Sequence, residues 1–170
     1  MTFDQLIKNA PQIILDKLAD CKTLRENPQW HPEENTYEHI RIVTERALGT
    51  NDPNLYLTGL LHDICKFDTH YINTKTGFPT SPGHELAAIR LMERDETIKM
   101  FISDFGGDFA TIHYLVKEHM RVKQIGVMRK SKVDVIVNHP LYPYLACFTK
   151  FDSMFTPDEV IAELQEKFKK

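Results

Sequence analysis

Imidazole and carboxylate side chains recur along this chain in an order that could bind metal. His62 and Asp63 stand side by side at the point where an apolar run ends. Neutral imidazole and carboxylate bind divalent transition metals well, and water bound to such an ion loses its proton near neutral pH. The candidate metal ligands are His39, His62, Asp63, His84, His119 and Asp152. The set predicts a hydrolytic metal centre.

Helices must position these side chains, because apolar residues recur at helical spacing along most of the chain. Helix-starting residues stand near Pro11, Asn35, Asp52, Ser81, Asp108, Pro143 and Thr156. The pattern puts the six candidate ligands on or beside apolar faces or near helix ends. We read the strand-like run 133–137 as helix, and we expect segment 67–80 to be irregular, either a binding loop or a surface connection.

Length and composition describe one globular domain spanning residues 1–170. The net charge of −3 gives no general attraction to nucleic acid, although a local basic patch stays open. The three cysteines are far apart in the sequence, which is typical of reduced residues in a cytosolic protein. No signal peptide is visible and no apolar run approaches the ~20 residues that span a bilayer. We therefore expect a cytoplasmic protein with no membrane partner.

Several short motifs resemble the HD superfamily of metal-dependent phosphohydrolases. The motifs are Trp30-His31-Pro32-Glu33 with Asn35-Thr36 and His39, then Leu61-His62-Asp63-Ile64-Cys65-Lys66, Gly83-His84-Glu85, His119 and the stretch 145–152. They look most like the HD domain of bacterial tRNA nucleotidyltransferases (CCA-adding enzymes), over residues of about 30–154. Cys65 stands where that family usually has Gly. The nucleotidyltransferase half is missing, so the polymerising activity is not carried over.

The resemblance implies an all-α bundle of about six to eight helices that holds one or two ions. His39, His62, Asp63 and Asp152 would bind the first ion. A second ion would share Asp63 and add His84 and His119. Alternatives remain open: the two aspartates could instead pair with Lys66 or Lys150, and His119 could be a core histidine or could face substrate. Imidazole-rich ligation favours Mn, Fe, Co, Ni or Zn over Mg.

The expected activity is hydrolysis of a phosphoester by a metal-bound hydroxide, with Asp63 and Lys66 as catalytic residues. The resemblance implies a nucleotide or RNA end as substrate, such as a 2′,3′-cyclic phosphodiester or a nucleoside phosphate. Lys66 would contact the phosphate, or would instead pair with Asp63 or Asp68. Arg121, Arg129 and Lys130 could form a substrate-binding rim. The alternative functions are a nucleotide- or RNA-binding module without turnover and an accessory subunit.

Overall fold

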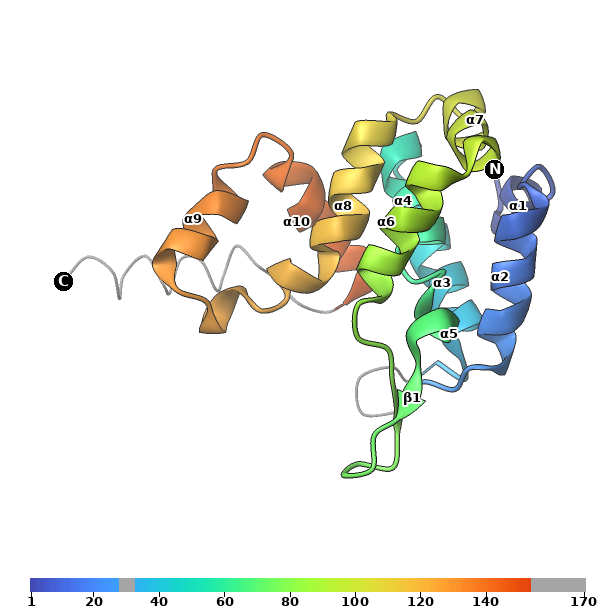
Figure 1. The fold of residues 1–170 in the computed structure, drawn as a ribbon. Helices are drawn as coiled ribbons and strands as arrows, with labels where there is room; N and C mark the ends of the chain where they lie inside the picture. Colours follow the sequence, from blue (N-terminus) through green and yellow to red (C-terminus); the bar gives the residue numbers. More distant parts are fainter. Residues whose placement is uncertain (28–32, 154–170) are drawn as a thin grey trace.

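Helices make up most of the protein in a computed structural model that describes residues 1–27 and 33–153 (Figure 1). In chain order the elements are α1 (Phe3–Ile7), α2 (Gln12–Thr23), α3 (Thr36–Leu48), α4 (Pro53–Leu61), α5 (Lys66–Thr69), β1 (Tyr71–Ile72), β2 (Pro79–Thr80), α6 (His84–Arg94), α7 (Glu96–Asp104), α8 (Phe109–Val122), the 3-10 turn η1 (Ile125–Val127), α9 (Lys130–Val137) and α10 (Tyr142–Asp152). The predicted all-α bundle is confirmed. Trp30, His31 and the helix predicted at Thr156 lie outside the described residues.

Polar side chains begin three of the predicted helices. Asn35 accepts a hydrogen bond from the backbone N–H of Glu38 at the start of α3. Asp52 caps α4 in the same way, and Asp108 caps α8 by accepting from the N–H of Thr111. Each cap satisfies an amide that the helix itself leaves unpaired. These local interactions explain why the starts of the helices could be predicted.

Helix α4 lies at the centre of the molecule because it is apolar on every side. All of its residues from Leu55 to Leu61 are buried, and a helix that is hydrophobic all round needs neighbours on each face. The helices α3, α8 and α10 supply them. The closest approach is to α3, where a Cβ built on Gly59 would lie 2.9 Å from Cα of Thr44. The residues that directly follow helix α4 therefore lie in the interior.

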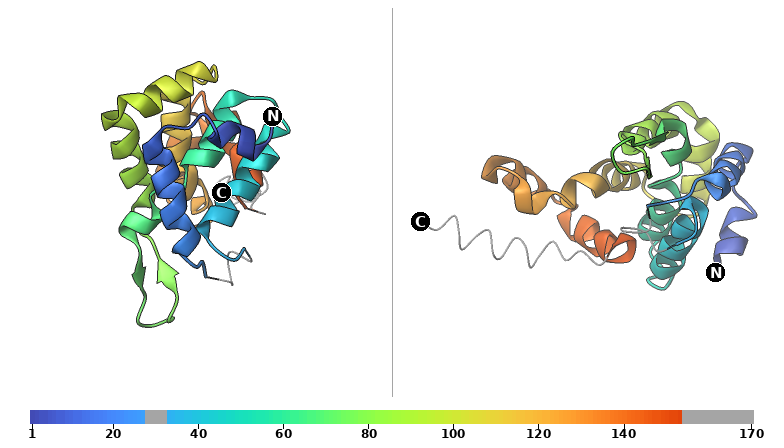
Figure 2. Two further views of the ribbon diagram at one scale, coloured as in Figure 1. Left: turned by 90° about the vertical axis from the view of Figure 1, so that its right-hand side faces the viewer. Right: turned by 90° about the horizontal axis from the view of Figure 1, so that it is seen from below.

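The core has two parts. The larger one contains α4 and extends to α1, α2, α6 and α7. The smaller one lies where α9 and η1 pack on α8 and α10. Figures 1 and 2 show α9 at the opposite side of the bundle from α1 and α2. No helix among the described residues is long and apolar enough to span a membrane.

Segment 67–80 differs from its prediction. It contains the rest of α5 and an antiparallel hairpin in which Tyr71 pairs with Thr80, so the expectation of an irregular segment is wrong. The turn is closed by N–H groups of Thr76 and Gly77 that donate to the carbonyl of Asn73. Gly77 takes a left-handed φ of 71°, which glycine adopts without strain. The strand-like run 133–137 is helical in α9, as predicted.

The close contact at Gly59 predicts a specific loss of stability. Gly59→Ala places a methyl group against the backbone of Thr44, so α3 and α4 must move apart. We expect overpacking to lower the free energy of unfolding by about 1–3 kcal/mol, measured by urea denaturation. Gly49→Ala is the matched control, because Gly49 already has helical φ and ψ at the exposed end of α3. An equal loss in both variants would contradict the packing explanation.

Candidate metal centre

Five helices place the six predicted ligands in one cluster. His39 lies in the first turn of α3, His84 is the first residue of α6, and Asp152 is the last residue of α10. His62 follows the last residue of α4, with Asp63 next in the chain, and His119 lies in the last turn of α8. All six are buried, with at most 5% of any residue exposed.

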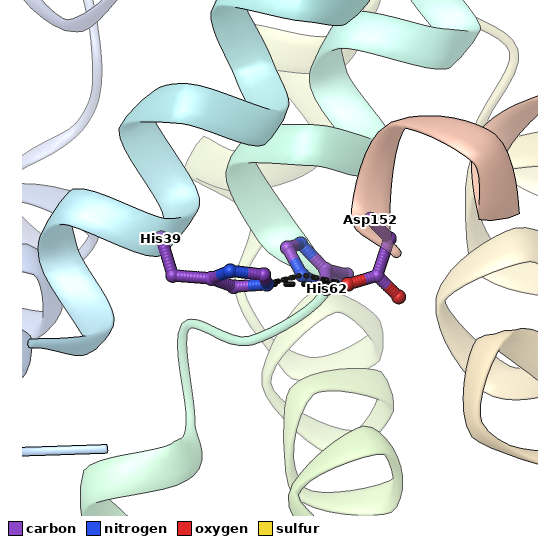
Figure 3. A group of neighbouring side chains, drawn as sticks. All are labelled: His39, His62 and Asp152. Carbon is purple, nitrogen blue, oxygen red and sulfur yellow. Dashed lines mark hydrogen bonds and ion pairs between the residues drawn. The ribbon is translucent and has the colours of Figure 1, made fainter. Parts of the chain in front are cut away.

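The first triad consists of His39, His62 and Asp152 (Figure 3). Nε2 of His39 lies 3.1 Å from Oδ1 of Asp152 and 3.4 Å from Nε2 of His62. Nε2 of His62 is 3.6 Å from the same oxygen of Asp152. Figure 3 shows the three side chains pointing toward one another from three different helices. Such a convergent set of two nitrogens and one oxygen could hold a metal ion.

The second triad consists of Asp63, His84 and His119. Oδ1 of Asp63 lies 2.9 Å from Nε2 of His84 and 3.6 Å from Nε2 of His119. The two imidazole nitrogens are 3.2 Å apart. The donor atoms are the same in kind and number as in the first triad, so this group could also hold an ion.

Asp63 joins the two triads because its carboxylate oxygens face in different directions. Oδ1 belongs to the second triad, while Oδ2 lies 3.2 Å from Nε2 of His62 and 3.5 Å from Nε2 of His39. One side chain thus offers an oxygen to each group. A carboxylate in this position could bridge two ions.

Backbone carbonyls fix the orientation of three of the histidines. Nδ1 of His62 lies 2.9 Å from the carbonyl oxygen of Gly59, and Nδ1 of His119 lies 2.7 Å from that of Val116. His84 makes the same contact with the residue three positions earlier. A carbonyl can only accept, so each Nδ1 must donate a proton. In the neutral rings, each Nε2 therefore carries a lone pair that points into the cluster.

Lone pairs that face one another need a cation between them. Nε2 of His84 and Nε2 of His119 approach to 3.2 Å, and Nε2 of His84 also faces Oδ1 of Asp63. That oxygen is buried and has no hydrogen-bond partner among the described residues. An unpaired carboxylate oxygen in the interior is costly. A metal ion would compensate the oxygen and both nitrogens at once, so the residues present fit a metal.

Two lysines among the described residues contact the cluster. Nζ of Lys66 lies 2.9 Å from Oδ2 of Asp63 and 2.9 Å from Oε1 of Glu26. Nζ of Lys123 lies 2.6 Å from Oδ2 of Asp152. The pairing of Lys66 with Asp63, one of the alternatives left open by the sequence, is therefore present. Asp152 pairs with Lys123, whereas the sequence suggested Lys150 as its alternative partner.

The described charges around the cluster are predominantly negative. Glu33 adds a fourth carboxylate, with Oε1 3.4 Å from Nδ1 of His39. Two ammonium groups and four carboxylates leave a net charge of −2 when the imidazoles are neutral. Neither Glu26 nor Lys123 was a candidate from the sequence, although Lys123 follows His119 by four residues and so shares its helix face.

The pKa values of the clustered side chains reflect the burial and the charges around them. Burial lowers the pKa of His62, but the charges of Asp63 and Asp152 outweigh burial and raise it to about 9. Burial raises the pKa of Asp63, yet His62 and Lys66 hold it well below its usual range. Burial lowers the pKa of His119. Burial also raises the pKa of Asp152, but Lys123 and His39 hold it well below its usual range. Asp63 and Asp152 therefore stay ionised and attract positive charge, either protons or metal.

The predicted basic rim lies outside these contacts. Arg121 pairs with Glu118 of its own helix, and Lys130 pairs with Asp134. Arg129 immediately precedes α9. Among the described contacts, none joins these three residues to the six candidate ligands, and their role in binding substrate stays a prediction.

Cys65 does not distort the backbone beside Asp63. Its φ of −102° and ψ of 14° are accessible to residues with a side chain. Glycine is therefore not required at this position.

A comparison with models of known protein families finds no match, and searches of curated proteins and of solved structures find none either. The chemistry of this protein must therefore be inferred from its own residues.

The two triads predict that mutation of one triad removes one metal ion while the other ion stays bound. The protein saturated with Mn²⁺ should hold two ions per chain, and the double variant His84→Ala with His119→Ala should hold one. Elemental analysis after removal of free metal measures this. His113→Ala is the control, because His113 lies on α8 but pairs with Glu93 outside the cluster. A wild type that binds only one ion at saturation would rule out two sites.

Metal removal should weaken the fold, because the cluster would lose the cations that compensate its net negative charge. An ion at one hundred times its dissociation constant stabilises the folded state by about 2.7 kcal/mol. The thermal midpoint of the wild type should thus fall on dialysis against a chelator. Asp63→Ala, which removes the shared ligand, should bind neither ion and show no such fall. Full metal retention in that variant would contradict the bridging position of Asp63.

Proposed function

We propose that this chain is a metal-dependent phosphohydrolase of the HD superfamily with two adjoining metal ions. The observation that carries the proposal is the placement of Asp63, which offers one oxygen to each triad. Two-metal hydrolases of phosphoesters hold their ions about 3.5–4 Å apart, a spacing that a bridging carboxylate suits. The motif resemblance adds the substrate class, a nucleotide or an RNA end that carries a phosphoester.

Bound ions would lower the pKa of a coordinated water and attract the charge that gathers on the phosphoryl oxygens. The chain's own residues hold the ligands ready for this. Backbone carbonyls keep the Nε2 atoms of His62, His84 and His119 aimed inward. Lys66 holds Oδ2 of Asp63. Because the ligand atoms are already oriented, little reorganisation is needed when metal binds.

Charge balance also suits a phosphate substrate. The described groups at the cluster sum to −2, so two divalent ions would bring the site to +2. A phosphomonoester dianion would then be drawn to a positive site. A single divalent ion would leave the site neutral, which gives less attraction for a phosphate.

Imidazole supplies four of the six candidate ligands, which favours Mn, Fe, Co, Ni or Zn over Mg. A binding module without turnover would not require two complete ligand sets around one shared carboxylate. The arrangement therefore favours an enzyme over a binding module or an accessory subunit.

A hydrolysis screen in which substrates and products are separated by chromatography tests the proposed function, because opening a cyclic phosphodiester releases no inorganic phosphate. The Mn²⁺- or Co²⁺-loaded protein should hydrolyse at least one substrate among 2′,3′-cyclic nucleotides, nucleoside monophosphates, dNTPs, dinucleoside polyphosphates and RNA ends. Turnover should vanish in Asp63→Ala and return to the chelated wild type when metal is restored, whereas His113→Ala should match the wild type. Hydrolysis that persists undiminished in Asp63→Ala would contradict the role of Asp63 in the reaction. A metal-loaded protein that is inactive on the whole panel would contradict this proposal.

A further inference from the structure

We infer that Lys123, rather than Lys66, is the cation that contacts the phosphate group of the substrate, and that Lys66 positions Asp63. This inference rests on the proposed function. It assigns different roles to two lysines that each approach one carboxylate of the cluster.

Lys123 lies next to the first triad. It directly follows α8 with helical φ and ψ, four residues after His119, so the two side chains lie on one helix face. Its ammonium contacts Oδ2 of Asp152, while Oδ1 of the same carboxylate faces His39 and His62. Lys123 therefore contacts the first triad directly and is separated from its two imidazoles by a single carboxylate group. Its side chain is 23% exposed, so an anion from solvent can reach it.

Lys66 is enclosed by negative charge. Its side chain is only 9% exposed and lies between Asp63 and Glu26, at 2.9 Å from each. Glu26 is fixed in turn by a hydrogen bond of 2.8 Å from the hydroxyl of Thr36. An anion that approached Lys66 would also meet the carboxylate of Glu26, which repels it. Lys66 is thus better suited to holding Oδ2 of Asp63 in place.

Metal binding would increase the difference between the two lysines in how far nearby carboxylates neutralise their charge. An ion held by the first triad would share the negative charge of Asp152 with Lys123. The ammonium of Lys123 would then be less neutralised. Lys66 would keep the charge of Glu26 beside it, whatever happens at Asp63. A phosphate oxygen forms strong, charge-assisted hydrogen bonds with a lysine that is not already neutralised. Lys123 meets this condition and Lys66 does not.

Binding of inorganic phosphate to the Mn²⁺-loaded protein, measured by calorimetry, tests this assignment without turnover. A lost hydrogen bond to a charged group weakens binding by about tenfold or more, so Lys123→Met should show a loss of this size at an unchanged metal content. Lys123→Arg should recover much of the affinity. Lys66→Met should lose less phosphate affinity and should lower the thermal midpoint. The control Lys117→Met removes the same charge from an exposed position on α8 and should match the wild type.

The outcomes separate this inference from the proposed function. Unchanged phosphate affinity in Lys123→Met, in a protein that still binds two ions, would overturn the role of Lys123 alone. A larger loss in Lys66→Met than in Lys123→Met, at equal metal content, would reverse the two assignments. A similar loss in Lys117→Met would show that general charge, and not contact, is responsible. A wild type that binds no metal would overturn the proposed function and this inference together.

Discussion

Buried negative charge is the constraint on which the centre of this structure depends. Asp63 and Asp152 are almost fully enclosed, and transferring such a carboxylate from water costs several kcal/mol unless positive charge and hydrogen bonds compensate it. The fold meets part of this requirement with two ammonium groups, those of Lys66 at the start of α5 and Lys123 directly after α8. Among the described groups at the cluster, the carboxylates outnumber the lysines. A core with this imbalance is organised to accept additional cations.

The same helices that form the apolar core also set the geometry of the polar cluster. Gly59 allows α3 to approach α4 closely, and its carbonyl oxygen accepts a hydrogen bond from Nδ1–H of His62. One residue thus affects both the spacing of the two helices and the orientation of a candidate ligand. Because His39 belongs to α3, any change in that spacing also changes the distance between His39 and His62. A change in the packing of α3 against α4 therefore also changes the geometry of the candidate metal site.

Local signals explain which parts of this structure could be predicted from sequence. Asn35 and Asp108 cap their helices through residues three positions away, so their effect is visible in a short window. The hairpin was missed because strands of two residues are too short to show alternation. Glu26 and Lys123 were missed for a different reason. Their partners, Lys66 and Asp152, are distant in the sequence, and only the packed helices bring them together.

The wide sequence separation of the first triad has a consequence for how the protein is made. His39 and Asp152 touch although 113 positions separate them, and contacts of this kind form late because a long loop must close first. During synthesis, His39, His62, His84 and His119 emerge before Asp152. The nascent chain therefore exposes isolated histidines, each a weak ligand, and completes the triad only when α10 docks. Any ion that the first triad could hold would thereby be selected by the packed helices rather than by the growing chain.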